Sequence, residues 1–182
     1  MMDHLRNLQL PENCIMVSFD VVSLYTKVPI PETILAVQER LIENTSWKTG
    51  QFSKLLVEDI ICLLTACLKN TYFQYGNELF LQNEGCPMGS PISGTVADIY
   101  LQKLENHIIP LNPKILFWKR YVDDVFAIIE GDENDANEIK NQLNLYHPNI
   151  QFTMETENDK EIAFLDIIND DSMSETDVFK KN

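Results

Sequence analysis

The chain has 182 residues and a mass of 21.0 kDa, which is the size of one large domain or two small ones. Hydrophobic residues make up 45% of it and charged residues 23%, a composition that excludes a disordered or fibrous chain. The longest nearly uninterrupted apolar stretch, residues 60–68, is too short to span a bilayer, and the first ten residues lack the apolar segment of a signal peptide. We therefore expect a globular protein with no membrane partner.

The formal net charge of −14 argues at first against a nucleic-acid partner. The charge is unevenly spread, because residues 130–182 hold 14 acidic and 4 basic side chains whereas residues 1–129 hold 14 acidic and 10 basic ones. Net charge therefore neither establishes nor excludes nucleic-acid binding. Four cysteines without a secretory signal are expected to be reduced thiols of an intracellular protein, with neither a disulfide scaffold nor a zinc site.

The first half of the chain begins with a predicted strand over residues 14–20, a short apolar run that ends at Asp20. Helical spacing of apolar residues then predicts a helix over residues 31–42, with Pro31 in its first turn. The same period predicts a second helix from about Ser53.

The middle of the chain contains a predicted β-hairpin, because Gly76-Asn77 separates the strand-like runs 72–75 and 79–82. An irregular loop follows over residues 85–91. We expect a helix to start there, with Ser90 as its cap and Pro91 at its first position, and to end before Pro110.

The last third is predicted to begin with a second hairpin, formed by residues 115–122 and 125–129 around the tight turn Asp123-Asp124. A polar-faced helix over residues 133–146 follows, and then strands over residues 150–154 and 162–168. The acidic residues 170–182 are expected to form a mobile tail.

This order of elements is a split βαββαβ pattern with an insertion, as in an RRM-like core. It predicts an α+β fold, in which an antiparallel sheet has helices packed on one face. We expect residues 1–169 to form this folded part.

The pair Asp123-Asp124 stands at the tip of the second hairpin, directly after an apolar strand. Adjacent carboxylates repel each other and raise each other's pKa unless a cation or water intervenes. Mg²⁺ takes one or two protein carboxylates and completes its shell with phosphate and water, so the pair suits such an ion. Asp is also a common turn residue, and taken alone the pair is equally consistent with ordinary turn chemistry.

Asp20 also stands at the end of an apolar strand. If this strand neighbours the hairpin, the carboxylates of Asp20, Asp123 and Asp124 lie at one edge of the sheet, although a strand-end Asp that caps a turn is common. Carboxylates in this arrangement suit two-metal phosphoryl transfer, in which ions about 3.5–4 Å apart activate the attacking oxygen and stabilise the leaving one.

Two more features fit the same reaction. Tyr25 lies five residues after Asp20, close enough to block the 2′-hydroxyl that separates ribose from deoxyribose. The glycines of the loop 85–91 allow a base or strand to approach closely, and the helix start after it offers free N–H groups to an anion. Taken individually, Tyr25 is more often a tyrosine packed in the core, and a loop such as 85–91 is more often an ordinary junction between a loop and a helix.

The segments FDVVSLY (19–25), GCPMGSP (85–91) and YVDD (121–124) resemble motifs A, B and C of reverse transcriptases. The resemblance runs from about residue 5 to about residue 170. Longer segments narrow it to the Penelope-like retroelements, whose polymerase core is similar to telomerase reverse transcriptase. These segments are SFDVVSLYT (18–26), MGSPIS (88–93), WKRYVDD (118–124) and HPNIQFTM (147–154).

The resemblance implies the palm of an RNA-directed DNA polymerase, working with two Mg²⁺ ions for which Mn²⁺ is a possible substitute. It further implies that residues 133–156 form motif D, with Lys160 as a candidate for its lysine. The residues that it assigns are Asp20, Asp123 and Asp124 for catalysis; Asp20, Val21, Asp123 and Asp124 for the metal ions; Val21, Tyr25, Met88 and Gly89 for the nucleotide; and Phe164 and Leu165 for the primer grip.

The implied partners are an RNA template, a DNA primer and deoxynucleoside triphosphates, with a nuclear location. In this family basic fingers precede motif A, a thumb follows motif E, and many members carry an endonuclease domain. We expect these regions to be absent here, with only part of the fingers insertion at about residues 30–84, so that the isolated chain polymerises poorly. The alternatives are the palm of an RNA-dependent RNA polymerase and a non-catalytic palm that acts as a binding module.

Overall fold

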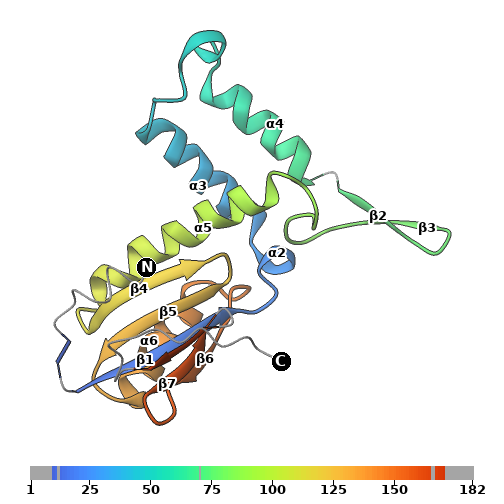
Figure 1. Cartoon of the computed structure of the whole chain (residues 1–182). Coiled ribbons are helices and arrows are strands. Elements are labelled where there is room, and N and C mark those ends of the chain that lie inside the picture. Colours follow the sequence, from blue (N-terminus) through green and yellow to red (C-terminus); the bar gives the residue numbers. More distant parts are fainter. Residues whose placement is uncertain (1–9, 12, 70, 165–166, 171–182) are drawn as a thin grey trace. The chain divides into compact units, whose positions relative to one another are not determined.

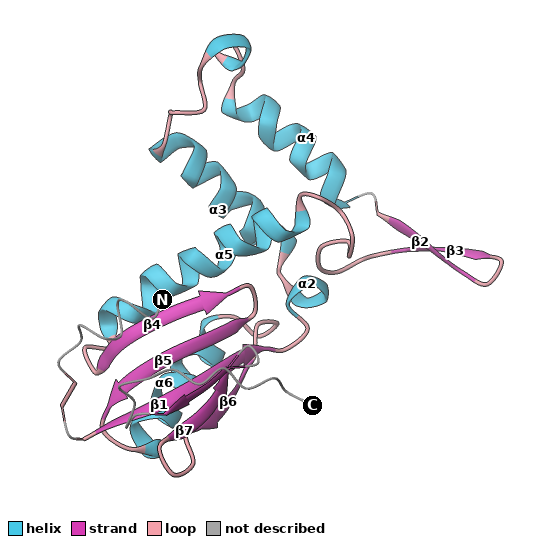
Figure 2. Cartoon of the chain, in the orientation of Figure 1, coloured by secondary structure: helices cyan, strands magenta, loops and turns pink. Residues whose placement is uncertain are grey.

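The computed structural model describes residues 10–11, 13–69, 71–164 and 167–170. The chain divides into two compact units, one made of residues 1–22 and 108–182 and the other of residues 23–107. Figure 1 labels the elements of both units, and Figure 2 separates their helices from their strands. Within the described ranges, no helix is long and apolar enough to cross a membrane.

The first unit is built on a four-stranded antiparallel sheet in the order β4-β5-β1-β6 (Figure 1). In chain order, β1, α5, β4, β5, α6 and β6 form the βαββαβ pattern, so the predicted α+β fold with an antiparallel sheet is confirmed. The bounds of these elements are β1 (Cys14–Val21), α5 (Ser93–Ile108), β4 (Ile115–Tyr121), β5 (Asp124–Glu130), α6 (Glu133–Tyr146) and β6 (Phe152–Thr156).

The sheet of the first unit is covered on both faces, as the unbroken buried run 125–129 of β5 indicates. The helix α6 contacts β5 and β6 and lies behind the sheet in Figure 1. Strand β7 (Glu161–Phe164), which pairs with β8 (Ile167–Asp170), contributes to the other side of the core. There two of its side chains join a buried cluster of Met16, Phe126, Ile128, Ile162 and Phe164.

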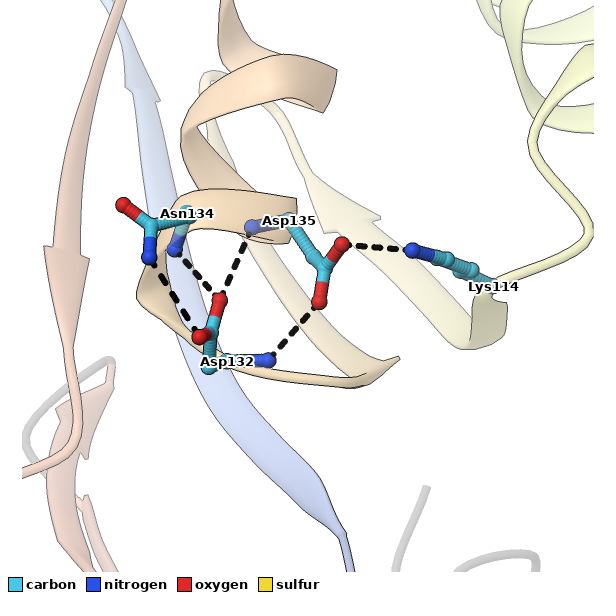
Figure 3. Close-up of polar contacts among 4 residues, drawn as sticks. All are labelled: Lys114, Asp132, Asn134 and Asp135. Atoms are coloured by element: carbon cyan, nitrogen blue, oxygen red, sulfur yellow. Dashed lines mark hydrogen bonds and ion pairs between the residues drawn. The ribbon is translucent and has the colours of Figure 1, made fainter.

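The start of α6 is held by a reciprocal cap (Figure 3). The Asp132 carboxylate accepts hydrogen bonds from the backbone N–H groups of Asn134 and Asp135 at 2.9 and 3.3 Å, and the Asp135 carboxylate accepts one from the Asp132 N–H at 3.0 Å. Lys114 adds an ion pair, with its Nζ 2.5 Å from Asp135 Oδ1. These bonds satisfy N–H groups that a helix start leaves free, so α6 begins at Glu133, where the sequence predicted it.

We predict that Asp135→Asn lowers the free energy of unfolding at pH 7, and that its difference from the wild type shrinks in acid. The hydrogen bond from Lys114, followed by that from the Asp132 backbone, lowers the pKa of Asp135. A carboxyl group whose pKa is lower in the folded state stabilises the fold above its ordinary pKa of about 4 and loses this effect as the pH falls through the folded value. Denaturant unfolding of both proteins between pH 7 and pH 3 measures the difference.

The matched control for Asp135→Asn is the double variant with Lys114→Met. Because Lys114 acts through the Asp135 carboxylate, Lys114→Met should cost less stability when Asp135 is already Asn. An unchanged gap between Asp135→Asn and wild type at pH 3 and pH 7 would contradict the assignment.

The second unit contains three long helices and a β-hairpin. Helices α3 and α4 pack on each other, and α3 buries Ile30, Thr33, Ala36 and Val37 at helical spacing. The hairpin turns at Gly76-Asn77, as predicted from the sequence. The elements are α2 (Leu24–Lys27), α3 (Ile30–Glu43), the 3₁₀ turn Gly50–Phe52, α4 (Val57–Lys69), β2 (Tyr72–Tyr75), β3 (Glu78–Leu81) and α5.

Two helix starts lie later than the sequence predicted. Helix α4 begins at Val57 rather than near Ser53, because the Asp59 carboxylate accepts a hydrogen bond from the Leu56 N–H at 3.1 Å and so caps the helix there. Helix α5 begins at Ser93 rather than after Ser90. The Ser93 N–H bonds the Ser90 carbonyl in a turn, which delays the helix by one turn.

The predicted single strand over residues 162–168 is wrong, because this segment is split into the antiparallel pair β7 and β8. Ile162 and Phe164 of β7 are buried and join the core cluster. Asp170, expected in the tail, ends β8, and the rest of the predicted tail, 171–182, lies outside the described residues.

Candidate active site

The carboxylates of Asp20 and Asp124 share one face of the sheet. Asp20 on β1 is the direct antiparallel partner of Asp124 on β5, and directly opposed residues project to the same side. The Val21 N–H also donates to the Asp123 carbonyl at 3.1 Å, which fastens the end of β1 to the turn of the hairpin. The structure therefore brings Asp20 to the same end of the sheet as Asp123 and Asp124, which lie about a hundred residues later in the sequence.

Other carboxylates act on Asp20 at this end of the sheet. The pKa of Asp20 is raised, mainly by partial burial and then by repulsion from Asp123 and Glu155. A divalent cation between such groups would relieve the repulsion, and carboxylate oxygens are the ligands that Mg²⁺ prefers. The side chains present thus fit a hard cation.

The described residues contain no group of three His, Cys, Asp or Glu side chains arranged to hold a metal ion. Asp123 lies in the turn, whereas Asp20 and Asp124 lie in the paired strands, so the three do not form a closed cage. Mg²⁺ is usually bound by one or two carboxylates together with substrate phosphates. An open pair such as Asp20 and Asp123 is compatible with that mode.

Glu155 is a charged neighbour of Asp20 that the sequence reasoning missed. It lies on β6 opposite Ser18 of β1, so it shares a sheet face with Asp20, one row away. The signal was present in the alternation of β6, where Thr153 and Glu155 are exposed and Phe152 is buried. The sequence of β6 alone, however, does not predict that this strand pairs with β1.

The turn of the hairpin is strained. Val122 has a φ of 57°, in the left-handed region that a β-branched residue rarely adopts. The Arg120 guanidinium donates a hydrogen bond to the Val122 carbonyl at 3.0 Å and so helps to hold this conformation. Strain of this kind gathers at functional sites, where the surrounding structure enforces it.

We predict that Val122→Asn raises the free energy of unfolding by about 1 kcal/mol, because Asn tolerates the left-handed region that disfavours valine. Denaturant unfolding measures the change. Val22→Asn is the control, since Val22 is similarly exposed but has no positive φ. Equal effects of the two substitutions would show that the backbone of Val122 is not strained.

Tyr25 and the loop 85–91 lie together in the second unit. The Cys86 N–H donates to the Tyr25 carbonyl at 2.6 Å, and a Cβ added at Gly94, at the start of α5, would lie 3.9 Å from the Tyr25 hydroxyl. Tyr25 is half-buried, so it is neither a fully buried core residue nor a fully exposed one. Met88 is 71% exposed, and the Cβ position of Gly89 is open.

Two of the other predicted site residues have buried side chains. Val21 is 1% exposed and Phe164 is 3% exposed, with the Phe164 ring 5.7 Å from that of Phe126. Val21 therefore offers a ligand its backbone alone. Leu165 lies outside the described residues, and Lys160 is exposed in the turn before β7.

The family model described as reverse transcriptase (RNA-dependent DNA polymerase) matches residues 1–160. A search of curated protein sequences found no significant match.

Among solved structures, apo telomerase of Candida tropicalis, truncated from its C-terminal domain, is similar with a TM-score of 0.69 and 17% identity, over 99% of this chain and 38% of that one. Telomerase of Candida albicans, in complex with the TWJ fragment of telomeric RNA, has a TM-score of 0.66 and 15% identity, over 93% of this chain and 31% of that one. The BmCPV RNA-dependent RNA polymerase at the elongation state is similar with a TM-score of 0.60 and 15% identity, over 87% of this chain and 16% of that one.

At these identities the likeness to solved structures establishes the fold, that of a polymerase palm. The chain spans about a third of the length of the telomerases that it matches. The family model, which covers most of the chain, establishes the family: this chain belongs to the reverse transcriptases.

Proposed function

We propose that the chain is the palm of an RNA-directed DNA polymerase of the Penelope-like type, which extends a DNA primer on an RNA template. The observation that carries the proposal is the junction of β1 with the YVDD hairpin, where Asp20 pairs with Asp124 and the Val21 N–H donates to the Asp123 carbonyl. The matched family and the motif segments 18–26, 88–93 and 118–124 support the polymerase reading.

In the proposed reaction, the primer 3′-hydroxyl loses its proton to solvent and its oxygen forms a bond to the α-phosphorus of a deoxynucleoside triphosphate. The bond from that phosphorus to the bridging oxygen breaks to release pyrophosphate. Asp20 and Asp123 would hold two Mg²⁺ ions, with Asp124 supporting them and Val21 contributing its backbone. When bound, such ions lower the pKa of the attacking hydroxyl and stabilise charge on the leaving oxygen. The chain's own contribution is to place these carboxylates at the end of two central strands, where Asp20 is exposed and Asp123 and Asp124 are partly exposed.

From the resemblance of their segments to motifs A and B, Tyr25, Met88 and Gly89 of the second unit would contact the nucleotide. The open Cβ position of Gly89 and the exposed side chain of Met88 leave room for a base, and Tyr25 would stand against the sugar. A rigid aromatic ring there excludes a 2′-hydroxyl by steric contact, which favours deoxynucleotides.

We predict that Tyr25→Ala in the full-length polymerase lowers its preference for deoxynucleotides over ribonucleotides by about tenfold or more, because the steric barrier to the 2′-hydroxyl is worth roughly 1–3 kcal/mol. The measurement is kcat/KM for dCTP and CTP in single-nucleotide extension. Tyr75→Ala, which removes an exposed tyrosine from the hairpin β2–β3, is the control. An unchanged sugar preference in Tyr25→Ala would show that Tyr25 does not exclude the 2′-hydroxyl.

The proposed function is tested by primer extension with Mg²⁺ on matched RNA and DNA templates, using the full-length gene product. Deoxynucleotide incorporation on RNA supports the proposal, and incorporation of ribonucleotides alone supports an RNA-dependent RNA polymerase, the alternative favoured by the BmCPV likeness. Absence of incorporation with any template would leave a non-catalytic palm. We expect the 182-residue chain alone to extend poorly, because it spans 38% of the telomerase that it matches and extension requires primer, template and nucleotide to be held in line.

A further inference from the structure

We infer that Gln82 is a positioning residue for sugar selection, which holds the loop 84–87 against the backbone of Tyr25. This inference rests on the proposed function, since it extends the role of Tyr25 to a residue outside the motifs. All the contacts that carry it lie within the second unit.

The Gln82 side chain bridges two carbonyl groups of the loop. Its amide nitrogen donates to the Glu84 carbonyl at 2.9 Å and to the Cys86 carbonyl at 3.1 Å. A primary amide has two N–H groups, so Gln82 can satisfy both carbonyls at once. The Gln82 backbone N–H donates to the Thr71 carbonyl at 2.8 Å, which anchors this bridge to the base of the hairpin β2–β3.

The loop that Gln82 bridges is fastened to Tyr25. Helix α2 has only four residues, so the Tyr25 carbonyl is one of those that a helix end leaves without an internal partner. The Cys86 N–H supplies that partner at 2.6 Å. At Gly85, an added Cβ would come within 2.4 Å of the Tyr25 carbonyl oxygen, so the two backbones are in direct contact.

A second bond fixes the far end of the loop. The Ser93 hydroxyl donates to the Pro87 carbonyl at 2.7 Å, from the first residue of α5. Gln82 and Ser93 thus hold the loop from both sides, and Cys86, which is fully buried, lies between them. Without the Gln82 bridge, the Glu84 and Cys86 carbonyls lose their partner and the Cys86 N–H loses its fixed direction toward Tyr25.

A ring that excludes a 2′-hydroxyl must hold its place, because the hydroxyl adds a single oxygen atom to the sugar. If the backbone of Tyr25 becomes more mobile, its ring occupies the blocking position for less of the time and excludes the 2′-oxygen less effectively. The expected consequence of removing the bridge is a loss of sugar preference, with a smaller loss of deoxynucleotide incorporation itself.

The test compares Gln82→Met, which keeps the length of the side chain and removes its donors, with Gln74→Met as the matched control. Gln74 lies on the same hairpin and its amide also donates to a turn carbonyl, that of Gly76, at 3.1 Å. Hydrogen exchange of the Cys86 amide in the 182-residue chain is the first readout. Gln82→Met should accelerate it about fivefold or more, the equivalent of one net hydrogen bond, and Gln74→Met should leave it unchanged.

The second readout is the ratio of kcat/KM for dCTP and CTP with the full-length polymerase. Gln82→Met should lower this ratio about fivefold in the wild-type background and should lower it no further when Tyr25 is already Ala. Gln82→Glu, which also lacks the amide donors, should behave as Gln82→Met does.

The outcomes separate the inference from the proposed function. Unchanged exchange at Cys86 in Gln82→Met overturns the bridge, whether or not the protein polymerises. Faster exchange with unchanged sugar preference, or a further loss of preference in the Tyr25→Ala background, overturns the link to Tyr25. Absence of polymerisation by the wild-type enzyme refutes the proposed function and with it the selection role, while the exchange measurement still decides the bridge.

Discussion

Asp123→Asn should reduce nucleotidyl transfer by the full-length polymerase about a thousandfold or more, because a catalytic metal ion supplies several kcal/mol of charge stabilisation and each 1.4 kcal/mol is a factor of ten. Asn keeps the shape of the side chain and removes the charge that would hold the ion. The measurement is single-turnover extension of a primer on an RNA template at saturating deoxynucleotide and Mg²⁺.

The stability of Asp123→Asn distinguishes a chemical defect from a folding defect. Repulsion from Asp123 helps to raise the pKa of Asp20, so the folded state binds the Asp20 proton more tightly than the unfolded state and pays for its ionisation at neutral pH. Removing the Asp123 charge relieves this repulsion, and unfolding at pH 7 should be unchanged or slightly more costly, by roughly a few tenths of a kcal/mol for partly exposed groups.

Asp159→Asn is the matched control for Asp123→Asn, since it removes an exposed carboxylate from another turn of the first unit. It should polymerise as the wild type does. Mg²⁺ titration adds an independent readout, because Mg²⁺ should raise the thermal midpoint of the wild type and of Asp159→Asn more than that of Asp123→Asn. Full activity of Asp123→Asn would contradict the assignment of Asp123.

Gly85→Ala should lower the free energy of unfolding by about 3 kcal/mol, the sum of the cost of a left-handed residue and of overpacking. Gly85 has a φ of +69°, and an added Cβ would lie 2.4 Å from Thr26 C and from the Tyr25 carbonyl oxygen. Both obstacles are backbone atoms, which cannot rotate away as a flexible side chain does. Denaturant unfolding measures the loss.

Gly76→Ala isolates the contribution of close packing at Gly85. Gly76 has a φ of +62°, nearly that of Gly85, but an added Cβ would meet nothing within 4 Å. Gly76→Ala should therefore lower the free energy of unfolding by only about 1 kcal/mol, the cost of placing a residue with a Cβ in the left-handed conformation. Equal costs at Gly76 and Gly85 would mean that the loop does not press on the backbone of α2.

The sequence predicted most of the secondary structure because the patterns that specify it are local. Alternating or continuous apolar residues predicted the strands, and Gly76-Asn77 marked the turn of the first hairpin. The second hairpin turns at Val122-Asp123 rather than at the predicted Asp123-Asp124, because Asp124 pairs with Tyr121 as the first residue of β5. The helix over residues 133–146 was predicted with its observed ends, and the structure adds the local cap at Asp132 that begins it. The start of α4 was missed because the Asp59 carboxylate accepts a hydrogen bond from the Leu56 N–H and so caps the helix there, and the start of α5 was missed because a turn over residues 90–93 precedes it.

The sequence also identified Asp20 and the YVDD pair as candidate metal ligands, through their place at the ends of apolar strands. It did not identify Glu155, whose approach to Asp20 depends on β6 pairing with β1. Nor did it indicate Gln82, whose role depends on where the loop 84–87 meets α2.

By itself, the amino-acid sequence determined which segments become strands and helices and which of them end in carboxylates, because propensity, periodicity and turn chemistry act over a few residues. Only the tertiary structure decided that β1 pairs with β5 in the register that sets Asp20 opposite Asp124, and that Cys86 bonds the carbonyl of Tyr25. Pairing and register are chosen by the burial of whole faces across distant segments, and a shift of one residue would turn Asp20 to the opposite face of the sheet.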